Sequence, residues 1–237
     1  MGGPATAGAA WVPETIEFCN KNNVPLDFIS THTYGVKQGF LDEFGTSGTV
    51  LNKDDSSVSG EVITSRQQIS NSAMPKLELH YTEWSSSYTP ADPIHDSYHS
   101  AAYILQKLKQ VGNAANSMSY WVFTDIFEEP GPRFTPFHGG FGLLNTQGIK
   151  KPAYFSYYLL NKLGKTELQN NDTSSWATKN AKGDVQLLFW DFTHTLPDAS
   201  INNQQYYIKD LPSKPKGNVK IEVAGLQKGK YNLEIYK

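Results

Sequence analysis

Residues 75–88, PKLELHYTEWSSSY, place a single carboxylate where an apolar strand ends. The first ten residues of this stretch alternate leucine and aromatic side chains with polar ones, which predicts a β-strand, and three serines follow. Glu83 stands between Thr82 and Trp84 at the end of that strand. The simplest interpretation is a solvated glutamate on an edge strand, so a functional role for Glu83 depends on what the rest of the chain places beside it.

Helical and strand-like segments alternate along residues 1–163. Apolar residues at helical spacing predict helices over residues 11–22, 61–73, 96–111 and 152–163. Apolar runs predict strands over residues 25–35, 75–84 and 117–129. Residues 36–60 are rich in Gly, Ser, Asp and Thr and show no period, which predicts a long loop. The alternation as a whole predicts parallel strands joined by helical crossovers.

Three of the predicted helices carry an apolar stripe that marks the face they are expected to bury. These stripes are Val12, Ile16 and Cys19 in the first helix, Ala101, Ile104, Leu105, Leu108 and Val111 in the third, and Phe155, Leu159 and Leu163 in the fourth.

From Lys165 onward the apolar period changes from helical spacing to strict alternation. Strands are expected over residues 184–192, 218–226 and 230–237, separated by turns that contain glycine. The chain is therefore expected to divide into an α/β part, residues 1–163, and an antiparallel β part, residues 164–237.

Composition excludes several classes of function. The net charge is −2 and the pI is about 6.3, so no strong positive field favours nucleic acid or an anionic membrane. Cys19 is the single cysteine, so no disulfide within the chain and no cysteine-based metal cluster is expected. No apolar run approaches the ~20 residues that span a bilayer, and residues 1–11 do not match a signal peptide. Aromatic residues make up 13%, which is typical of sugar-binding proteins but also of aromatic cores.

The three predicted strand ends share one kind of chemistry. In parallel α/β folds, functional groups gather where the strands end, because loops there project over a rigid sheet. The three ends present imidazole, carboxylate and aromatic groups: His32 and Tyr34; Glu83, Trp84 and Tyr88; and Trp121, Asp125, Glu128 and Glu129. Paired carboxyl groups and flat rings that orient a sugar are what cleavage of a glycosidic bond requires.

The same segments resemble the second half of a family 39 glycoside hydrolase, the family of β-xylosidases and α-L-iduronidases. The resemblance is carried by STHTYG, TEWSSSYTP…HDSYHSAAY and SYWVFTDIFEE…FHGGFGL, and more weakly by GGPATAG near the start. It implies an α/β plus all-β fold. Residues 1–163 would be the C-terminal half of a (β/α)8 TIM barrel, and residues 164–237 would belong to an antiparallel β-sandwich.

The resemblance also implies roles for individual residues. Glu83 matches the nucleophile of a retaining exo-glycosidase that releases terminal β-D-xylosyl residues from xylo-oligosaccharides, with no cofactor and no metal. The residues that match sugar-binding positions are His32, Tyr34, Tyr88, Trp121, Glu128 and Glu129.

One departure from the family pattern concerns the general acid/base. The family places this residue in an Asn-Glu-Pro segment at the end of the fourth barrel strand, and these 237 residues contain no Asn-Glu-Pro. The expectation is a chain that starts after strand four and is nearly inactive on natural xylosides. An open half-barrel also exposes sheet edges, which predicts self-association.

Two other functions remain open at this point. An α-L-iduronidase needs a basic group for the uronate carboxylate, and Arg133 is the candidate. A non-catalytic carbohydrate-binding fragment would use Trp84 and Trp121 as stacking platforms.

Several of these residue types also have ordinary structural interpretations. His95 and His99 are four residues apart, as in some zinc pairs, but no third ligand is spaced nearby. Asp125 is interpreted as a structural hydrogen-bonding residue. His32 as a core histidine, Glu129 as a solvated side chain and His138 as a loop hydrogen-bonding residue are alternatives to their functional roles.

Overall fold

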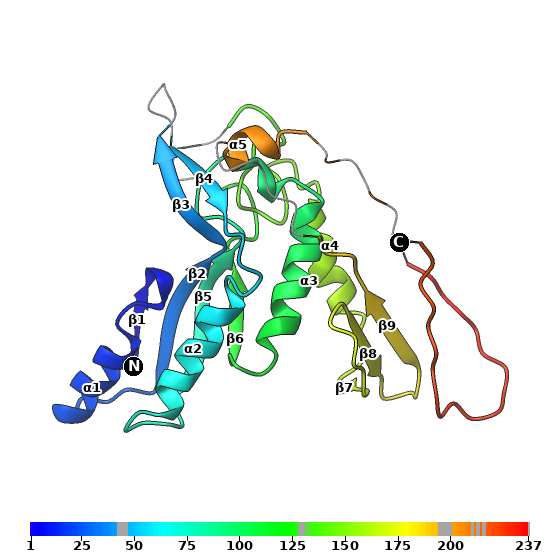
Figure 1. Ribbon diagram of the computed structural model, residues 1–237, viewed down its shortest axis with the longest axis horizontal. Helices are drawn as coiled ribbons and strands as arrows, with labels where there is room; N and C mark the ends of the chain where they lie inside the picture. Colours follow the sequence, from blue (N-terminus) through cyan, green and yellow to red (C-terminus); the bar gives the residue numbers. More distant parts are fainter. Residues whose placement is uncertain are drawn as a thin grey trace.

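The computed structural model describes residues 1–41, 47–127, 131, 133–193, 201–209, 211, 214 and 217–236. Four parallel strands form the main sheet in the order β1-β2-β5-β6 (Figure 1). Their bounds are β1 Gly2–Thr6, β2 Phe28–Tyr34, β5 Glu78–Ser85 and β6 Ser117–Tyr120. The helices between them are α1 Val12–Lys21, α2 Ser59–Ser70 and α3 His99–Val111, and α4 Pro152–Leu160 follows. The predicted alternation of parallel strands and helices is confirmed.

The main hydrophobic cluster lies between the sheet and helices α1 and α2. Val12, Ile16 and Cys19 of α1 are all buried, so the predicted face of this helix is confirmed. Leu79 and Tyr81 of β5 are fully buried in the same region. Each large apolar side chain buried here contributes about 1.5–3 kcal/mol to folding. This cluster fixes the outer face of β2 and β5, which leaves their other face for polar groups.

The predicted face of α4 is wrong. Ala153 and Ser156 are the buried residues of this helix, whereas Phe155 is 46% exposed. The helix is apolar or aromatic on nearly every side, so hydrophobic pattern alone does not select a face. The face with the small residues is the buried one, because it allows α4 to approach α3 closely. The Ser156 hydroxyl donates to the Ala101 carbonyl at 2.8 Å.

The predicted loop over residues 36–60 contains a hairpin instead. Strands β3 Val36–Leu41 and β4 Ser47–Leu51 pair antiparallel, with Val36 opposite Leu51. Gly35 joins β2 to this hairpin where a Cβ atom would lie 2.0 Å from the Tyr103 hydroxyl. The sequence pattern does not predict the hairpin, because polar residues and glycines interrupt both strands. In β4, Val50 is 8% exposed and Leu51 is fully buried, so burial holds this strand as well as pairing.

Strand β6, the last strand of the main sheet, is shorter than predicted. The strand expected over residues 117–129 ends at Tyr120, and the Trp121–Val122 peptide bond is cis. Residues beyond it bond to a later segment, since the Val122 amide donates to the Phe141 carbonyl and the Leu143 amide donates to the Val122 carbonyl.

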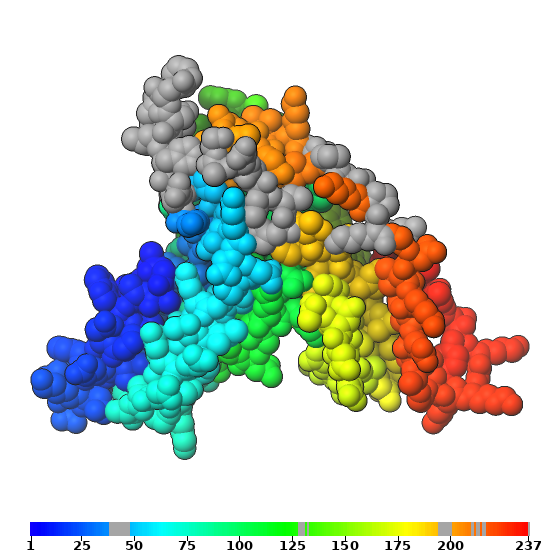
Figure 2. All heavy atoms as spheres, in the orientation of Figure 1, coloured from blue at the N-terminus to red at the C-terminus, as the bar shows by residue number. Residues whose placement is uncertain are grey.

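The β part of the chain is only partly as predicted. Strands β7 Thr166–Glu167, β8 Ser175–Lys179 and β9 Val185–Phe189 form an antiparallel sheet, and β9 lies within the predicted strand 184–192. The strands predicted over residues 218–226 and 230–237 are wrong for the described residues 217–236, which contain no regular structure. This segment runs along the outside of the molecule (Figure 2). Its alternating side chains have no covering layer, and Val219 and Ile221 are 65% and 49% exposed.

A short helix from the second part of the chain packs on the first. Helix α5, Asn203–Tyr206, lies beside β4 (Figure 1). The Asn203 side chain accepts from the Leu51 amide at 3.0 Å and donates to the buried Asp92 carboxylate at 3.0 Å. The boundary predicted between residues 163 and 164 falls between α4 and β7 and stays a prediction.

Buried tyrosines predict a loss of stability at high pH. Burial raises the pKa of Tyr81 and of Tyr103 above the ordinary value of 10.0. The unfolded chain releases these protons near pH 10 and the folded chain does not. Their contribution to stability is therefore complete below pH 10 and is lost as the pH rises toward the raised values. Burial lowers the pKa of Lys107 below its ordinary value of 10.5. This shift makes the free energy of unfolding rise with pH, but only below pH 10.5, so it does not affect the slope above that pH.

We therefore expect the free energy of unfolding to fall above pH 10.5 by about 1.4 kcal/mol per pH unit for each such tyrosine. Urea unfolding followed by circular dichroism, at intervals between pH 8 and 11.5, measures this slope. Tyr103→Phe should reduce the slope by about 1.4 kcal/mol per pH unit, and the difference between the two proteins should stay constant below pH 9. Parallel curves above pH 10.5 would contradict the prediction.

Within the described part of the chain, none of the helices has the length and apolar character required to cross a bilayer.

Candidate active site

Glu83 lies at the end of an interior strand. Strand β5 runs between β2 and β6, so the interpretation of Glu83 as a solvated edge-strand residue is wrong. The pairing of β2 with β5 shifts by one residue near this end: Thr31 lies opposite Tyr81, whereas His32 lies opposite Glu83. Thr82 is the extra residue of this β-bulge. A bulge of this kind re-aims the side chains that follow it.

The bulge decides which side of the sheet Glu83 faces. Strict alternation would place Glu83 with Leu79 and Tyr81, which are buried in the hydrophobic cluster. Because one residue is inserted, Trp84 enters the apolar side instead and is fully buried. Glu83 turns to the polar side with His32.

Two side chains of β2 contact the Glu83 carboxylate. The Tyr34 hydroxyl donates to Glu83 Oε2 at 2.8 Å. His32 Nδ1 lies 3.4 Å from the same oxygen, and the other ring nitrogen lies 3.1 Å from the Thr82 hydroxyl. The Glu83 and His32 side chains are 27% and 20% exposed, so the carboxylate is both held by partners and open to an incoming molecule. The structure brings together the predicted residues His32, Tyr34 and Glu83.

Two predicted aromatic residues lie at the same edge of the sheet. The Tyr88 ring meets the Tyr34 ring edge-on at a centroid distance of 6.0 Å and is 48% exposed. Trp121 directly follows β6, where its amide donates to the Trp84 carbonyl at 3.1 Å. The Trp121 ring is partly buried and contacts the Phe127 ring at 5.3 Å. Aromatic faces therefore border the edge where Glu83 lies.

The other residues predicted to contact sugar are not all placed at this edge. Glu128 and Glu129 lie outside the described residues. Trp84 is fully buried, so it does not serve as an exposed stacking platform. Arg133 is exposed.

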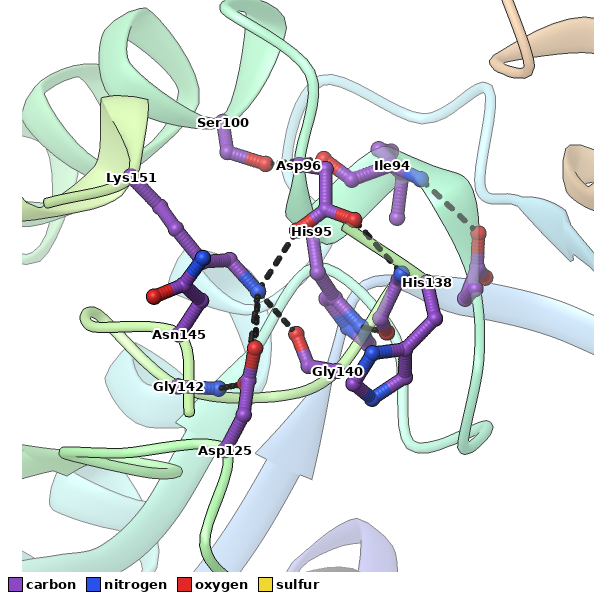
Figure 3. A network of polar contacts seen from close by, with 12 residues as sticks. Ile94, His95, Asp96, Ser100, Asp125, His138, Gly140, Gly142, Asn145 and Lys151 are labelled. Atoms are coloured by element: carbon purple, nitrogen blue, oxygen red, sulfur yellow. Dashed lines mark hydrogen bonds and ion pairs between the residues drawn. The ribbon is translucent and has the colours of Figure 1, made fainter. Parts of the chain in front are cut away.

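Asp125 is part of a buried polar network, as its structural interpretation predicted. Its carboxylate is fully buried, accepts from the Gly142 amide at 2.6 Å and lies 3.2 Å from Lys151 Nζ (Figure 3). Sequence reasoning missed Lys151, because a lysine directly before the proline that starts α4 is usually solvated. No local signal in the sequence indicates that this lysine is buried.

The two histidines His95 and His99 contact different groups. His95 is buried, and its Nδ1 and Nε2 lie 2.8 and 3.0 Å from the carbonyls of Gly139 and Ser87. His99 faces aromatic rings. His138 Nδ1 lies 2.9 Å from the Thr135 carbonyl, as expected for a loop hydrogen-bonding residue. Among the described residues, no three His, Cys, Asp or Glu side chains are grouped to hold a metal ion.

Comparisons with known proteins point to one family. The sequence profile described as Glycosyl hydrolases family 39 matches residues 1–236. A protein from Caldicellulosiruptor saccharolyticus named Beta-xylosidase is 43% identical over 177 residues, which are 73% of this chain and 35% of that protein. A protein of the same name from Geobacillus stearothermophilus is 35% identical over 194 residues, covering 81% of this chain and 38% of that protein.

Solved structures give the same result. The GH39 enzyme from Xanthomonas axonopodis pv. citri superimposes with a TM-score of 0.83 at 51% identity, covering 89% of this chain and 41% of that chain. A protein described as a monomeric beta-xylosidase from Caulobacter crescentus CB15 gives a TM-score of 0.83 at 48% identity, covering 89% of this chain and 42% of that chain. The chain thus spans about two-fifths of the length of these relatives.

Proposed function

Because the chain belongs to glycoside hydrolase family 39, we propose that it is the nucleophile-bearing part of a retaining β-xylosidase. Its four parallel strands are the last four strands of a (β/α)8 barrel, and residues 164–237 belong to an accessory β domain. The substrate is the terminal β-D-xylosyl residue of a xylo-oligosaccharide. The beta-xylosidase name of two relatives and of one solved structure supports this substrate.

The proposed reaction begins with attack by a Glu83 oxygen on the anomeric carbon. The bond between that carbon and the glycosidic oxygen breaks, and a glycosyl ester of Glu83 forms. Water then attacks the same carbon from the opposite side and releases xylose, so configuration is retained. Protonation of the leaving oxygen and deprotonation of the water require a second carboxyl group, which the family places in the Asn-Glu-Pro segment that these 237 residues lack.

The observation that carries the proposal is the pair of contacts to Glu83 Oε2 from Tyr34 and His32, at the carboxyl end of a parallel sheet. A nucleophilic carboxylate has to be fixed in direction, and a hydroxyl that donates to one of its oxygens does this. Trp121 and Tyr88 form walls of the sugar subsite in this proposal. Glu128 and Glu129 bind sugar hydroxyls.

Covalent labelling tests the function without the missing acid. In 2,4-dinitrophenyl 2-deoxy-2-fluoro-β-xyloside, the leaving group departs as a stable anion, and the fluorine slows hydrolysis of the glycosyl ester. We expect the protein to gain the mass of one fluoroxylosyl group, and peptide mapping to place it on Glu83. The matching fluorinated iduronide tests the iduronidase alternative with Arg133. A chain that binds xylose but takes up neither label would instead be a carbohydrate-binding fragment.

The Tyr34 hydroxyl is expected to orient the attacking oxygen. Tyr34→Phe should slow the labelling step by about 10- to 100-fold, since a hydrogen bond to a charged group contributes roughly 1.5–3 kcal/mol. The rate of mass gain at saturating inactivator measures this step. Tyr98→Phe is the matched control, because it removes a hydroxyl that donates to the Leu211 carbonyl, and it should leave the rate unchanged. Equal rates for Tyr34→Phe and the unchanged protein would contradict this role.

The predicted self-association follows from β1 and β6 being the edges of the four-stranded sheet. Sedimentation velocity over a range of concentrations measures it.

A further inference from the structure

Lys151 is a buried cation in contact with three acceptor groups. Its side chain is fully buried just before the first residue of α4. Nζ lies 2.6 Å from Asp96 Oδ1 and 3.2 Å from Asp125 Oδ2, and it donates to the Gly140 carbonyl at 2.6 Å (Figure 3). An ammonium group has three N–H donors. Here the group donates to the Asp125 carboxylate and to the Gly140 carbonyl, and it forms an ion pair with Asp96.

The three acceptors come from two loops. Asp96 lies in the loop between β5 and α3, whereas Asp125 and Gly140 lie in different parts of the long connection between β6 and α4. The carboxylates also hold the segment around Gly140 directly: Asp96 Oδ2 accepts from the Gly139 amide at 2.5 Å, and Asp125 Oδ1 accepts from the Gly142 amide. Lys151 is thus the common point of a network that joins the loops beyond two neighbouring strands.

Each of these two loops carries one aromatic residue of the proposed sugar subsite near its start. Tyr88 is the third residue after β5, in the loop that also contains Asp96, and Trp121 directly follows β6, four residues before Asp125. We infer that Lys151 is a positioning residue that fixes the spacing of Tyr88 and Trp121 and thereby sets affinity for the sugar. This inference rests on the proposed function.

Stability alone does not account for such a network. A buried ion pair is often no more stabilising than apolar residues of similar volume, because both charges have to leave water. Here a single ammonium group serves two carboxylates, of which Asp125 is fully buried and Asp96 is 16% exposed. What the charges add is direction, since the contacts fix the β5–α3 loop relative to the β6–α4 connection.

The network does not contact the proposed nucleophile. Glu83 is held by Tyr34 and His32, which are residues of the neighbouring strand β2. Loss of Lys151 should therefore weaken binding of the sugar while leaving the chemical step largely intact. This expected split separates a positioning role from a catalytic one.

The test uses Lys151→Met and the fluorinated dinitrophenyl xyloside. From the dependence of the labelling rate on inactivator concentration, we expect the dissociation constant to rise about tenfold and the limiting rate to stay within about twofold. Hydrogen exchange gives a second readout, because the Val122 and Asp125 amides donate to the Phe141 and Leu144 carbonyls. Exchange at these two amides should accelerate about tenfold in the variant.

Lys107→Met is the matched control. Lys107 is equally buried, donates to the Asp55 carbonyl and lies near the Asp55 carboxylate, but it is anchored to the loop before α2. It should leave both the dissociation constant and the exchange of the two amides unchanged. Equal effects of the two substitutions would overturn the inference, because they would show a general loss of stability.

A second variant covers the case in which Lys151→Met does not fold. Asp125→Asn keeps an acceptor for the Gly142 amide and removes one charge, and it should raise the dissociation constant in the same direction. An unchanged dissociation constant in a folded Asp125→Asn variant would overturn the inference. If the wild-type chain takes up no label, the proposed function is wrong. In that case, faster exchange of the two amides in Lys151→Met would still support the coupling of the two loops by Lys151, but not its effect on sugar affinity.

Discussion

Glu83→Gln should abolish covalent labelling by the fluorinated dinitrophenyl xyloside, with a fall in rate of about 10⁴-fold or more. The amide has nearly the same shape as the carboxylate, and its oxygen can still accept from the Tyr34 hydroxyl. It has no negative charge and no nucleophilic oxygen for the anomeric carbon. Intact-protein mass spectrometry over hours measures the residual rate.

The control for this variant lies on the same strand. Glu78 is exposed at the other end of β5 and pairs with His80 at 3.0 Å, so Glu78→Gln should be labelled at the wild-type rate. Urea unfolding of both variants checks that neither has lost its fold. The assignment of Glu83 as the nucleophile would be wrong if Glu83→Gln were labelled at the wild-type rate. It would also be wrong if the label in the wild-type chain mapped to another carboxylate.

The meeting of His32, Tyr34 and Glu83 was predictable because parallel strands end at one edge of a sheet. Apolar runs located β2 and β5 well enough to show that the three residues fall near strand ends. The bulge at Thr82 was not predictable from the same pattern. Alternation along LELHYTE places Glu83 on the face of Leu79 and Tyr81, and one inserted residue reverses this. The sequence therefore predicted that these three residues meet, but not the backbone irregularity that turns the carboxylate toward the other two.

The failed predictions share a physical cause. A hydrophobic pattern shows which face an element will bury when something covers it, but it does not show what the cover is. The alternating residues 218–226 have no covering layer, and they remain exposed without forming a strand. Helix α4 has apolar residues on most sides, so the close approach to α3 at Ser156 decides its face. The burial of Lys151 is unpredictable for a similar reason. It depends on two carboxylates that stand 26 and 55 residues earlier in the chain.

The leaving group should decide whether this chain turns over a xyloside. These 237 residues contain no Asn-Glu-Pro, so in the proposed mechanism an unactivated alkoxide has to leave without a proton. We expect hydrolysis of xylobiose to be slower by about 10²–10⁴-fold than in a family member that carries the acid. Cleavage of 2,4-dinitrophenyl β-xyloside needs no such proton and should give a rapid burst of dinitrophenolate. Release of xylose after the burst should be slow, because no base activates the attacking water.

Azide distinguishes this explanation from a poorly folded chain. Azide is already an anion, so it attacks the glycosyl ester of Glu83 without help from a base. Its addition should raise steady-state turnover of the dinitrophenyl substrate by about 10²-fold, the lower end of what proton transfer contributes, and yield β-xylosyl azide. The anomeric configuration of that product, read by NMR, reports two inversions at one carbon. An α-azide would mean direct displacement without the ester, and rapid cleavage of xylobiose would mean that another group in this chain supplies the proton.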